Sequence, residues 1–245
     1  MGTDRSLSTV PLLDAGLPAG VRGGFTTRAG GGGQAPYAGL NLGDHVGDDP
    51  AVVSAHREAL RRSLGADALV VPHQVHGADV VEVVSPPASA PEADALLTRV
   101  PGIALAIVVA DCVPVLLVDA AAGVVGVAHA GRPGLVAGVV PSLVAALRSA
   151  GARDLVAALG PSVCGGCYEV PAAMADDVAA VVPAARSRTR WGTASVDVAA
   201  GVRAQLAELG VPSRDVARCT LEHDDLFSYR RDGTTGRSAG VVVLA

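Results

Sequence analysis

Two apolar runs that lie close together constrain the fold of this chain most strongly. They fall within residues 100–131, which read "VPGIALAIVVADCVPVLLVDAAAGVVGVAHAG". A membrane-spanning helix needs about 20 apolar residues, whereas Asp111, Pro114 and Asp119 interrupt this stretch. Short apolar runs bounded by polar and glycine residues are typical of buried strands. We therefore predict buried strands within 100–118 and 123–130.

The remaining pattern predicts helices between strands. Half of the residues are apolar but only six are Phe, Trp or Tyr, so Val, Leu and Ala must fill the interior. Helices are predicted over 49–65, with Asp49 as N-cap and Pro50 in the first turn, over 131–151, with a kink or break at Pro141, and over 196–210. A strand is predicted at 239–245. Residues 1–245 are thus expected to form one α+β domain, with mixed β-sheets flanked by helices.

The charged residues exclude several kinds of function. The net charge is −5 and no Lys/Arg block occurs, which argues against nucleic acid as a partner. All 19 basic residues are arginines, so a lysine Schiff base or a P-loop lysine is impossible. An anionic ligand must be bound by arginine or by backbone amides. The N-terminus lacks an apolar segment of secretory length, so we expect a cytoplasmic protein without a membrane partner.

Chemically reactive side chains stand where the two predicted strand regions meet polar or glycine-rich turns. Cys112 follows one apolar run and His129 ends the next, although Val or Ala would serve a core equally well. His73 and His76 lie upstream in "VVPHQVHGADV". A thiolate and two imidazoles suit a Zn²⁺ site with one open position. Spacing alone leaves the alternative open, because a lone cysteine is often a small core residue.

The other cysteines give a weaker signal. Cys164 and Cys167 form "CGGC", and Cys219 lies far downstream. A zinc ribbon needs a second CxxC pair, and no strand–helix redox context surrounds this one. We therefore interpret it as a cysteine pair in a loop.

Several motifs occur in an order that resembles the YfiH family, also called the laccase-like or polyphenol-oxidase-like domain family. The resemblance extends from "GFTTRAGGG" near Gly24 to the C-terminus, and its motifs are "HQVHG", "ADALLT", "ADCVPVLLVD", "GVAHAG", "GPSVCGGCYEV" and "FSYRRDGTTGR". It implies an αββα arrangement and a zinc-dependent purine nucleoside phosphorylase that also deaminates adenosine and cleaves methylthioadenosine. Some members are described as peptidoglycan editing factors. The zinc ligands implied are His76, Cys112 and His129, with His73 as second choice.

The resemblance also implies roles for other residues. Purine nucleosides and phosphate would be the substrates. Asp111 and Glu169 are the candidates for proton transfer beside Cys112 and His129. Candidates for substrate binding are Arg28, Asn41, Arg231 and Arg237, with Arg230 beside them. Asn41 is the only asparagine, and its alternative role is that of a turn residue. Copper oxidase chemistry is not expected, because the six histidines include no His-x-His pair.

One departure from the family pattern bears on phosphate. The family's "AHAGWRG" reads "AHAGRPG" here, so Arg132 replaces a Trp and Pro133 an Arg. We expect weaker phosphate binding, unless the neighbouring Arg132 compensates. Two further interpretations stay open: a metal-free cysteine hydrolase that acts in peptidoglycan editing, with Cys112 as nucleophile and His129 as base, and a non-catalytic zinc-containing binding domain.

Overall fold

The apolar runs form strands that are buried on both faces. The computed structural model describes residues 9–245, so the segment 1–8 of the N-terminus lies outside it. Strands β6 (Ile103–Val109), β7 (Val113–Asp119) and β8 (Val124–Ala130) are buried along their whole length. Alternate residues of β7 enter different cores: Val115 and Leu117 pack into one, Leu116 and Val118 into another. The predicted strands are confirmed, with the first divided at 110–112.

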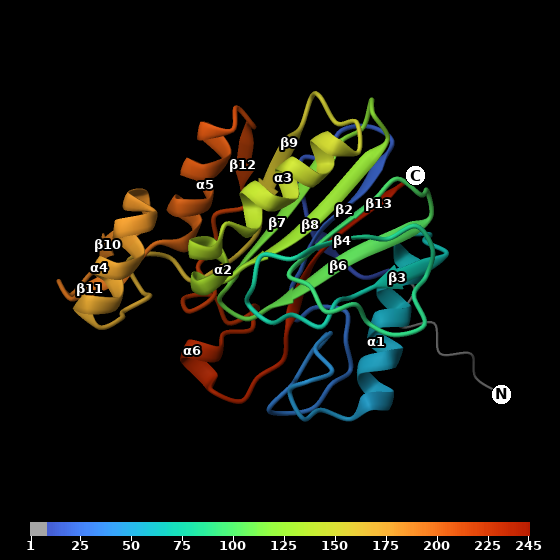
Figure 1. The fold of residues 1–245 in the computed structure, drawn as a ribbon. Coiled ribbons are helices and arrows are strands. Elements are labelled where there is room, and N and C mark those ends of the chain that lie inside the picture. The colour runs from blue at the N-terminus through green and yellow to red at the C-terminus, as the bar shows by residue number, and fades with distance from the viewer. Residues whose placement is uncertain (1–8) are drawn as a thin grey trace.

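Two large sheets stack face to face (Figure 1). The first has the order β1 (Leu12–Leu13), β2 (Val21–Thr26), β13 (Ser238–Leu244), β6 and β3 (Ala68–Val70). The second has the order β12 (Ser213–Asp215), β9 (Val156–Leu159), β7, β8, β5 (Ala95–Thr98) and β4 (Val80–Glu82). Both sheets mix parallel and antiparallel pairs. One apolar core, which includes Leu105 and Leu116, lies between them.

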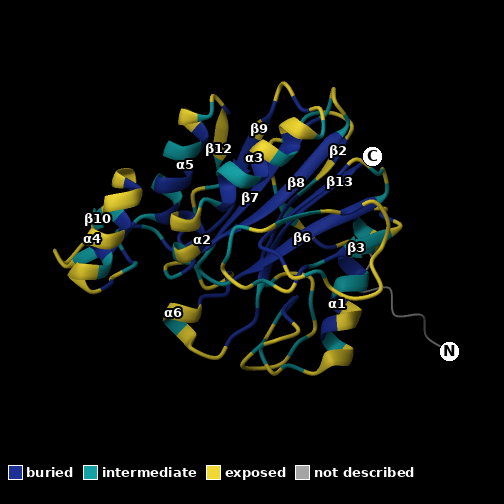
Figure 2. Cartoon of the chain, in the orientation of Figure 1, coloured by how far each residue is buried: buried dark blue, intermediate teal, exposed yellow. Residues whose placement is uncertain are grey.

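Helices cover the outer faces of both sheets, as Figures 1 and 2 show. Helix α1 (Pro50–Ser63) packs on the five-stranded sheet through Ala59 and Leu60. The six-stranded sheet is covered by helices α2 (Arg132–Ala137), α3 (Val139–Ser149) and α5 (Val198–Glu208), whereas α4 (Ala172–Val181) lies to one side and packs on the short hairpin at 186–196. The short helices η1 (Pro183–Ala185) and α6 (Tyr229–Asp232) and the hairpin β10 (Arg186–Arg188)–β11 (Ala194–Val196) complete the chain. The αββα layering confirms the predicted α+β class.

The helix predictions hold, except for the position of one break. Asp49 caps α1 by accepting a hydrogen bond from the backbone N–H of Ala51, and Pro50 is its first residue, as predicted. The region 131–151 splits at Gly138, whose φ of 83° lies in the left-handed region, and not at Pro141. Pro141 stands in the first turn of α3, where its missing N–H costs no helical hydrogen bond. Among the described residues, no helix has the length and apolarity needed to cross a membrane.

Asp119, at the end of β7, is expected to stabilise the fold in a pH-dependent way. Burial opposes its charge, but backbone N–H groups of Ala122, Arg153 and Asp154 donate to it and hold its pKa below the usual 3.8. A lowered pKa stabilises the fold above about pH 4, and this contribution is lost as the pH falls through the folded-state pKa. Asp119→Ala should lower the free energy of unfolding at pH 7 by about 3 kcal/mol.

Urea unfolding from pH 7 to pH 3 measures this effect. The difference between Asp119→Ala and the wild type should shrink as the pH falls below about 4. Asp154→Ala removes an exposed carboxylate but keeps the backbone N–H that donates to Asp119. This control variant should change the free energy of unfolding by less than about 0.5 kcal/mol. A difference between Asp119→Ala and the wild type that stays constant over this pH range would contradict the electrostatic explanation.

Candidate metal and substrate site

A cavity of about 380 Å³ opens where the β6–β7 loop, the end of β8 and the start of α2 meet the C-terminal segment. Strand ends that feed tight turns present side chains to such clefts on a rigid scaffold. The lining comprises His45, Gln74, His76, Val108, Val109, Ala110, Asp111, Cys112, His129, Arg132, Val163, Tyr168, Val198, Tyr229, Arg230 and Arg237.

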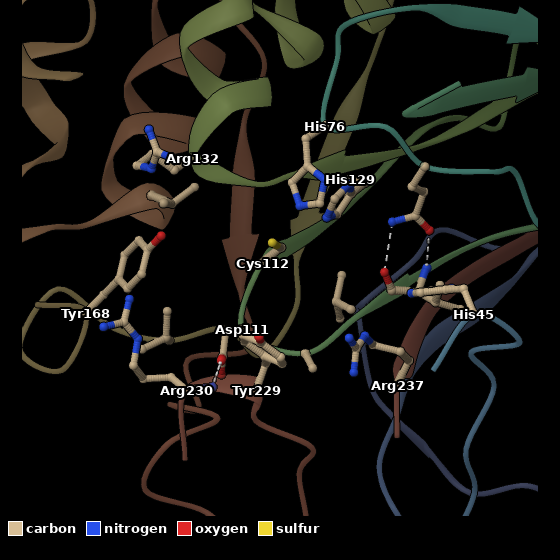
Figure 3. A pocket seen from close by; sticks show the side chains of 16 residues that line it. His45, His76, Asp111, Cys112, His129, Arg132, Tyr168, Tyr229, Arg230 and Arg237 are labelled. Carbon is tan, nitrogen blue, oxygen red and sulfur yellow. Dashed lines mark hydrogen bonds between the residues drawn. The ribbon is translucent and has the colours of Figure 1, made fainter. Parts of the chain in front are cut away.

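Three of these side chains converge on one point (Figure 3). His76, Cys112 and His129 offer one donor atom each, and these atoms lie within 4.8 Å of one another. The two imidazoles meet edge to face, with ring centroids 4.7 Å apart. Space beside them is tight, because a Cβ on Gly131 would lie 2.8 Å from Cδ2 of His76. His73 lies outside the lining and pairs through its backbone with Glu92.

The buried carboxylate of Asp94 holds two of the three side chains in place. It accepts hydrogen bonds from the backbone N–H groups of Val75 (3.1 Å), His76 (3.0 Å) and Gly77 (2.6 Å). It also accepts one from Nδ1 of His129 (2.7 Å), which leaves Nε2 of that ring as the free donor atom. These hydrogen bonds stabilise the loop that gives His76 its positive φ of 61°. Carboxylates that orient a metal-binding imidazole commonly play this part.

Asp94 was not among the residues selected from the sequence. A signal was present, because Asp94 directly precedes β5, in which all four residues are buried. A charged side chain that is itself fully buried needs strong partners, and here they are the imidazole and the three amides.

The ionisation of the Cys112 thiol and that of the His129 imidazole depend on each other. Burial opposes ionisation of the Cys112 thiol, but the charge and hydrogen bond of His129, helped by His76, lower its pKa to about 6. Burial likewise opposes the charge on His129, but the Cys112 thiolate and Asp94 raise its pKa to about 9. Both shifts favour a thiolate–imidazolium pair in the metal-free site. A metal ion that binds here displaces the proton from His129.

Asp111 lines the cavity in a strained conformation. Its φ of 91° is unusual for a residue with a side chain. Its carboxylate accepts from the hydroxyl of Thr220 (2.6 Å) and from the backbone N–H of Arg230 (2.7 Å). Asp111 thus ties the Cys112 loop to the segment that carries α6.

Three arginines line the same cavity. Arg132 is the first residue of α2, and no hydrogen bond or ion pair engages its side chain among residues 9–245. Arg230 donates to the backbone oxygen of Glu169 (3.1 Å) and lies over the ring of Tyr168. Arg237 donates to the backbone oxygens of Thr235 and Gly236. Figure 3 shows Arg132 and Arg237 on different sides of the trio.

Besides His73, four residues that the sequence predicts for the site lie outside this lining. Glu169 is exposed, and its carboxylate accepts from the indole of Trp191. Arg28 pairs with Asp232 (2.8 Å), and Arg231 donates to backbone oxygens that include those of Thr220 and Leu226. Fully buried Asn41 accepts from the backbone N–H of Arg237 (2.8 Å). The alternative role of Asn41 as a turn residue fits its hydrogen bonds to Gly43, and its contact with Arg237 positions a cavity residue.

Asp94→Asn tests whether this carboxylate orients the trio. The amide keeps the size of the side chain but turns one acceptor into a donor that faces backbone N–H groups. Zinc affinity, measured by competition with a chromophoric chelator, should fall by about tenfold or more. Glu92→Gln neutralises an exposed carboxylate two residues away and should leave the affinity unchanged. Equal affinities of the wild type and Asp94→Asn would show that Asp94 serves the fold alone.

The chain is similar to known proteins over most of its length. A family model described as multi-copper polyphenol oxidoreductase laccase matches residues 22–245. A purine nucleoside phosphorylase of Streptomyces coelicolor is 55% identical over 232 residues, which cover 92% of this chain and 96% of the relative. An adenosine deaminase from an unknown prokaryotic organism is 36% identical, over 89% and 92% of the two chains.

A solved structure also matches the fold. The protein YlmD from Geobacillus stearothermophilus superposes with a TM-score of 0.87 at 33% identity and covers 100% of this chain and 98% of its own. The family match includes every strand of both sheets except β1 and the first residue of β2, and every residue of the cavity lining. The chain therefore belongs to the multi-copper polyphenol oxidoreductase laccase family, which is the YfiH family that its motifs indicate.

Proposed function

We propose that this protein is a zinc-dependent purine nucleoside phosphorylase that also deaminates adenosine and cleaves methylthioadenosine. The observation that supports it most is the convergence of His76, Cys112 and His129 in a cavity that three arginines line. Relatives named purine nucleoside phosphorylase, 50–56% identical over about nine-tenths of the chain, give the substrate class. One more distant relative is named adenosine deaminase.

The donor set of the trio fits zinc. Two imidazoles and a thiolate supply three ligands, and the cavity leaves the fourth direction open to substrate. The same ligand types also occur in copper centres, which add a distant methionine, but the described lining contains no methionine. When bound, zinc would act as a Lewis acid and lower the pKa of water to about 7.

The protein's own side chains would orient the metal ligand, transfer a proton and bind the phosphate and the purine. Asp94 keeps Nε2 of His129 directed at the metal position. Two carboxylates are candidates for proton transfer. Asp111 lines the cavity and Glu169 does not, so we propose that Asp111 transfers the proton during the reaction. Arg132, Arg230 and Arg237 are the cations available to phosphate, whose oxygens suit the two-point contact of a guanidinium. The exposed ring of Tyr229 offers an apolar face to the purine.

A specific contact also favours a second candidate function. Cys112, His129 and Asp94 form a chain of thiolate, imidazole and carboxylate, which is the arrangement of a cysteine hydrolase. In that case the protein would act without metal, with Cys112 as nucleophile. The position of His76 beside the same sulfur favours the metal site, because a hydrolase needs one imidazole only.

Product analysis tests the proposed function directly. Zinc-loaded protein is incubated with adenosine, inosine, guanosine and methylthioadenosine, with and without phosphate, and the products are separated. We expect free purine base and a ribose phosphate only when phosphate is present, and inosine from adenosine in either case. The proposal fails if the zinc-loaded protein yields neither product, or if metal-free protein is fully active.

A further inference from the structure

A second cluster of metal-binding side chains lies behind one wall of the cavity. Cys164, Cys167, Cys219 and Glu222 offer one donor atom each, and these atoms lie within 4.8 Å of one another. The first two come from the loop after β9 and the others from the segment after β12. The sulfurs belong to a small apolar cluster with Val163, separate from the main cores. The "CGGC" motif is therefore more than the isolated cysteine pair that the sequence predicts.

We propose that this cluster is a structural zinc site, independent of the proposed catalytic site and of the proposed function. Three thiolates and one carboxylate supply all four ligands of a closed tetrahedral site. With Zn–S distances of about 2.3 Å, tetrahedral sulfurs lie roughly 3.8 Å apart, which is compatible with donor atoms that all lie within 4.8 Å of one another. The two-residue spacing of Cys164 and Cys167 is the common spacing of zinc-binding cysteines.

The side chain of Arg190 shows that the cluster attracts a cation. Its Nη2 donates both to Sγ of Cys167 and to Oε1 of Glu222. A zinc ion that binds these two atoms would displace the guanidinium, which is exposed enough to move into solvent. Arg190 therefore competes with the metal, and removing it should favour metal binding.

A route for the ion is present as well. Cys164, Cys219 and Glu222 line a second cavity, of about 340 Å³. All four cysteines of the protein are free thiols in the structure. The three thiols of the cluster can therefore serve as ligands without the reduction of a disulfide.

An ion at this place would brace the wall of the first cavity. Val163 and Tyr168 line that cavity and flank the "CGGC" loop. Cys219 directly precedes Thr220, whose hydroxyl donates to Asp111 beside Cys112. The zinc would reinforce the existing link between these two segments, which consists of a backbone bridge between Ser162 and Cys219 and a hydrogen bond from the backbone N–H of Cys164 to Sγ of Cys219 (3.4 Å).

Zinc content of purified protein, measured by elemental analysis after removal of loosely bound metal, tests the proposal. The wild type should hold about two equivalents per chain. Cys112→Ser, which removes a ligand of the first site, should hold about one, and so should Cys167→Ser. The double variant should hold almost none. Arg190→Ala should keep about two equivalents and release the second more slowly to a chelator than the wild type does.

The outcomes separate this proposal from the proposed function. If Cys167→Ser keeps the wild-type zinc content and Cys112→Ser loses all of it, the second site does not exist. If Cys112→Ser keeps the wild-type content while Cys167→Ser loses zinc, the first site fails instead.

A measurement on the unaltered protein guards against a Cys167→Ser variant that does not fold. Cys164, Cys167 and Cys219 should resist alkylation until a chelator is added, as peptide mass spectrometry can show. Equal labelling before and after chelation, or a disulfide among these three cysteines in freshly purified protein, would overturn the proposal.

Discussion

Replacing Cys112 with alanine is expected to remove one zinc equivalent per chain and to lower nucleoside turnover by about 10³-fold or more. The reason is that the sulfur is one of only three donors at an open site, so two imidazoles remain to hold the ion. The substitution should disturb the neighbouring backbone little, because Asp111 keeps its hydrogen bonds from Thr220 and Arg230, so the loss of activity comes mainly from the loss of zinc. Elemental analysis and initial rates with adenosine, with and without phosphate, measure the two losses.

Alkylation of the same sulfur separates the metal site from the cysteine hydrolase. Zinc-bound Cys112 should be protected, while metal-free Cys112 should react, with a rate that rises as the pH passes through its pKa of about 6. Restoring zinc to the metal-free protein should restore both activity and protection. If Cys112→Ala loses activity but keeps all its metal, or if the active protein reacts at once with the reagent, Cys112 is a nucleophile and not a ligand.

The sequence predicted the fold well because its strongest signal was burial. Strands such as β7 and β8 lie between two apolar layers, so all their residues except Asp119 and His129 are apolar or small, and such runs stand out without any contact information. The sequence predicts the helix break at Pro141 because proline is the stronger local signal. The break lies instead at Gly138, because its left-handed backbone turns the chain between α2 and α3. Pro141 is accommodated in the first turn of α3.

The site was harder to predict beyond the trio. His76, Cys112 and His129 follow from motifs, but Asp94 acts through contacts with segments 17 to 35 residues away, which no local pattern reveals. Asn41 and Arg231 belong to the same motifs as cavity residues, yet their hydrogen bonds hold the backbone of the C-terminal segment. Cys219 joins the "CGGC" loop across 55 residues, so its partnership with Cys164 is visible only in three dimensions.

Given the change from "WRG" to "RPG" after His129, we propose that Arg132 is the main phosphate-binding residue. Pro133 is exposed and lies outside the cavity lining, whereas Arg132 is half-buried and belongs to it. Arg230 and Arg237 already donate to backbone oxygens, so their guanidinium groups are partly committed to the fold. Arg132 makes no such contact within the described chain and has its donors available. The structure thus favours compensation by Arg132 over the weak phosphate binding that the sequence alone predicts.

Arg132→Ala should therefore lower kcat/KM for phosphate by about 10²-fold. This factor corresponds to the loss of a hydrogen-bonded charge pair, which contributes up to about 3 kcal/mol. Adenosine deamination needs no second anion and should stay within about threefold of the wild type. Arg132→Lys should recover part of the loss, since lysine restores the charge but not the two-point contact. Arg153→Ala, at an exposed arginine outside the cavity lining, serves as the matched control and should change neither activity. A parallel fall of both activities in Arg132→Ala would mean that this side chain positions the nucleoside, and phosphate recognition would then rest on Arg230 and Arg237.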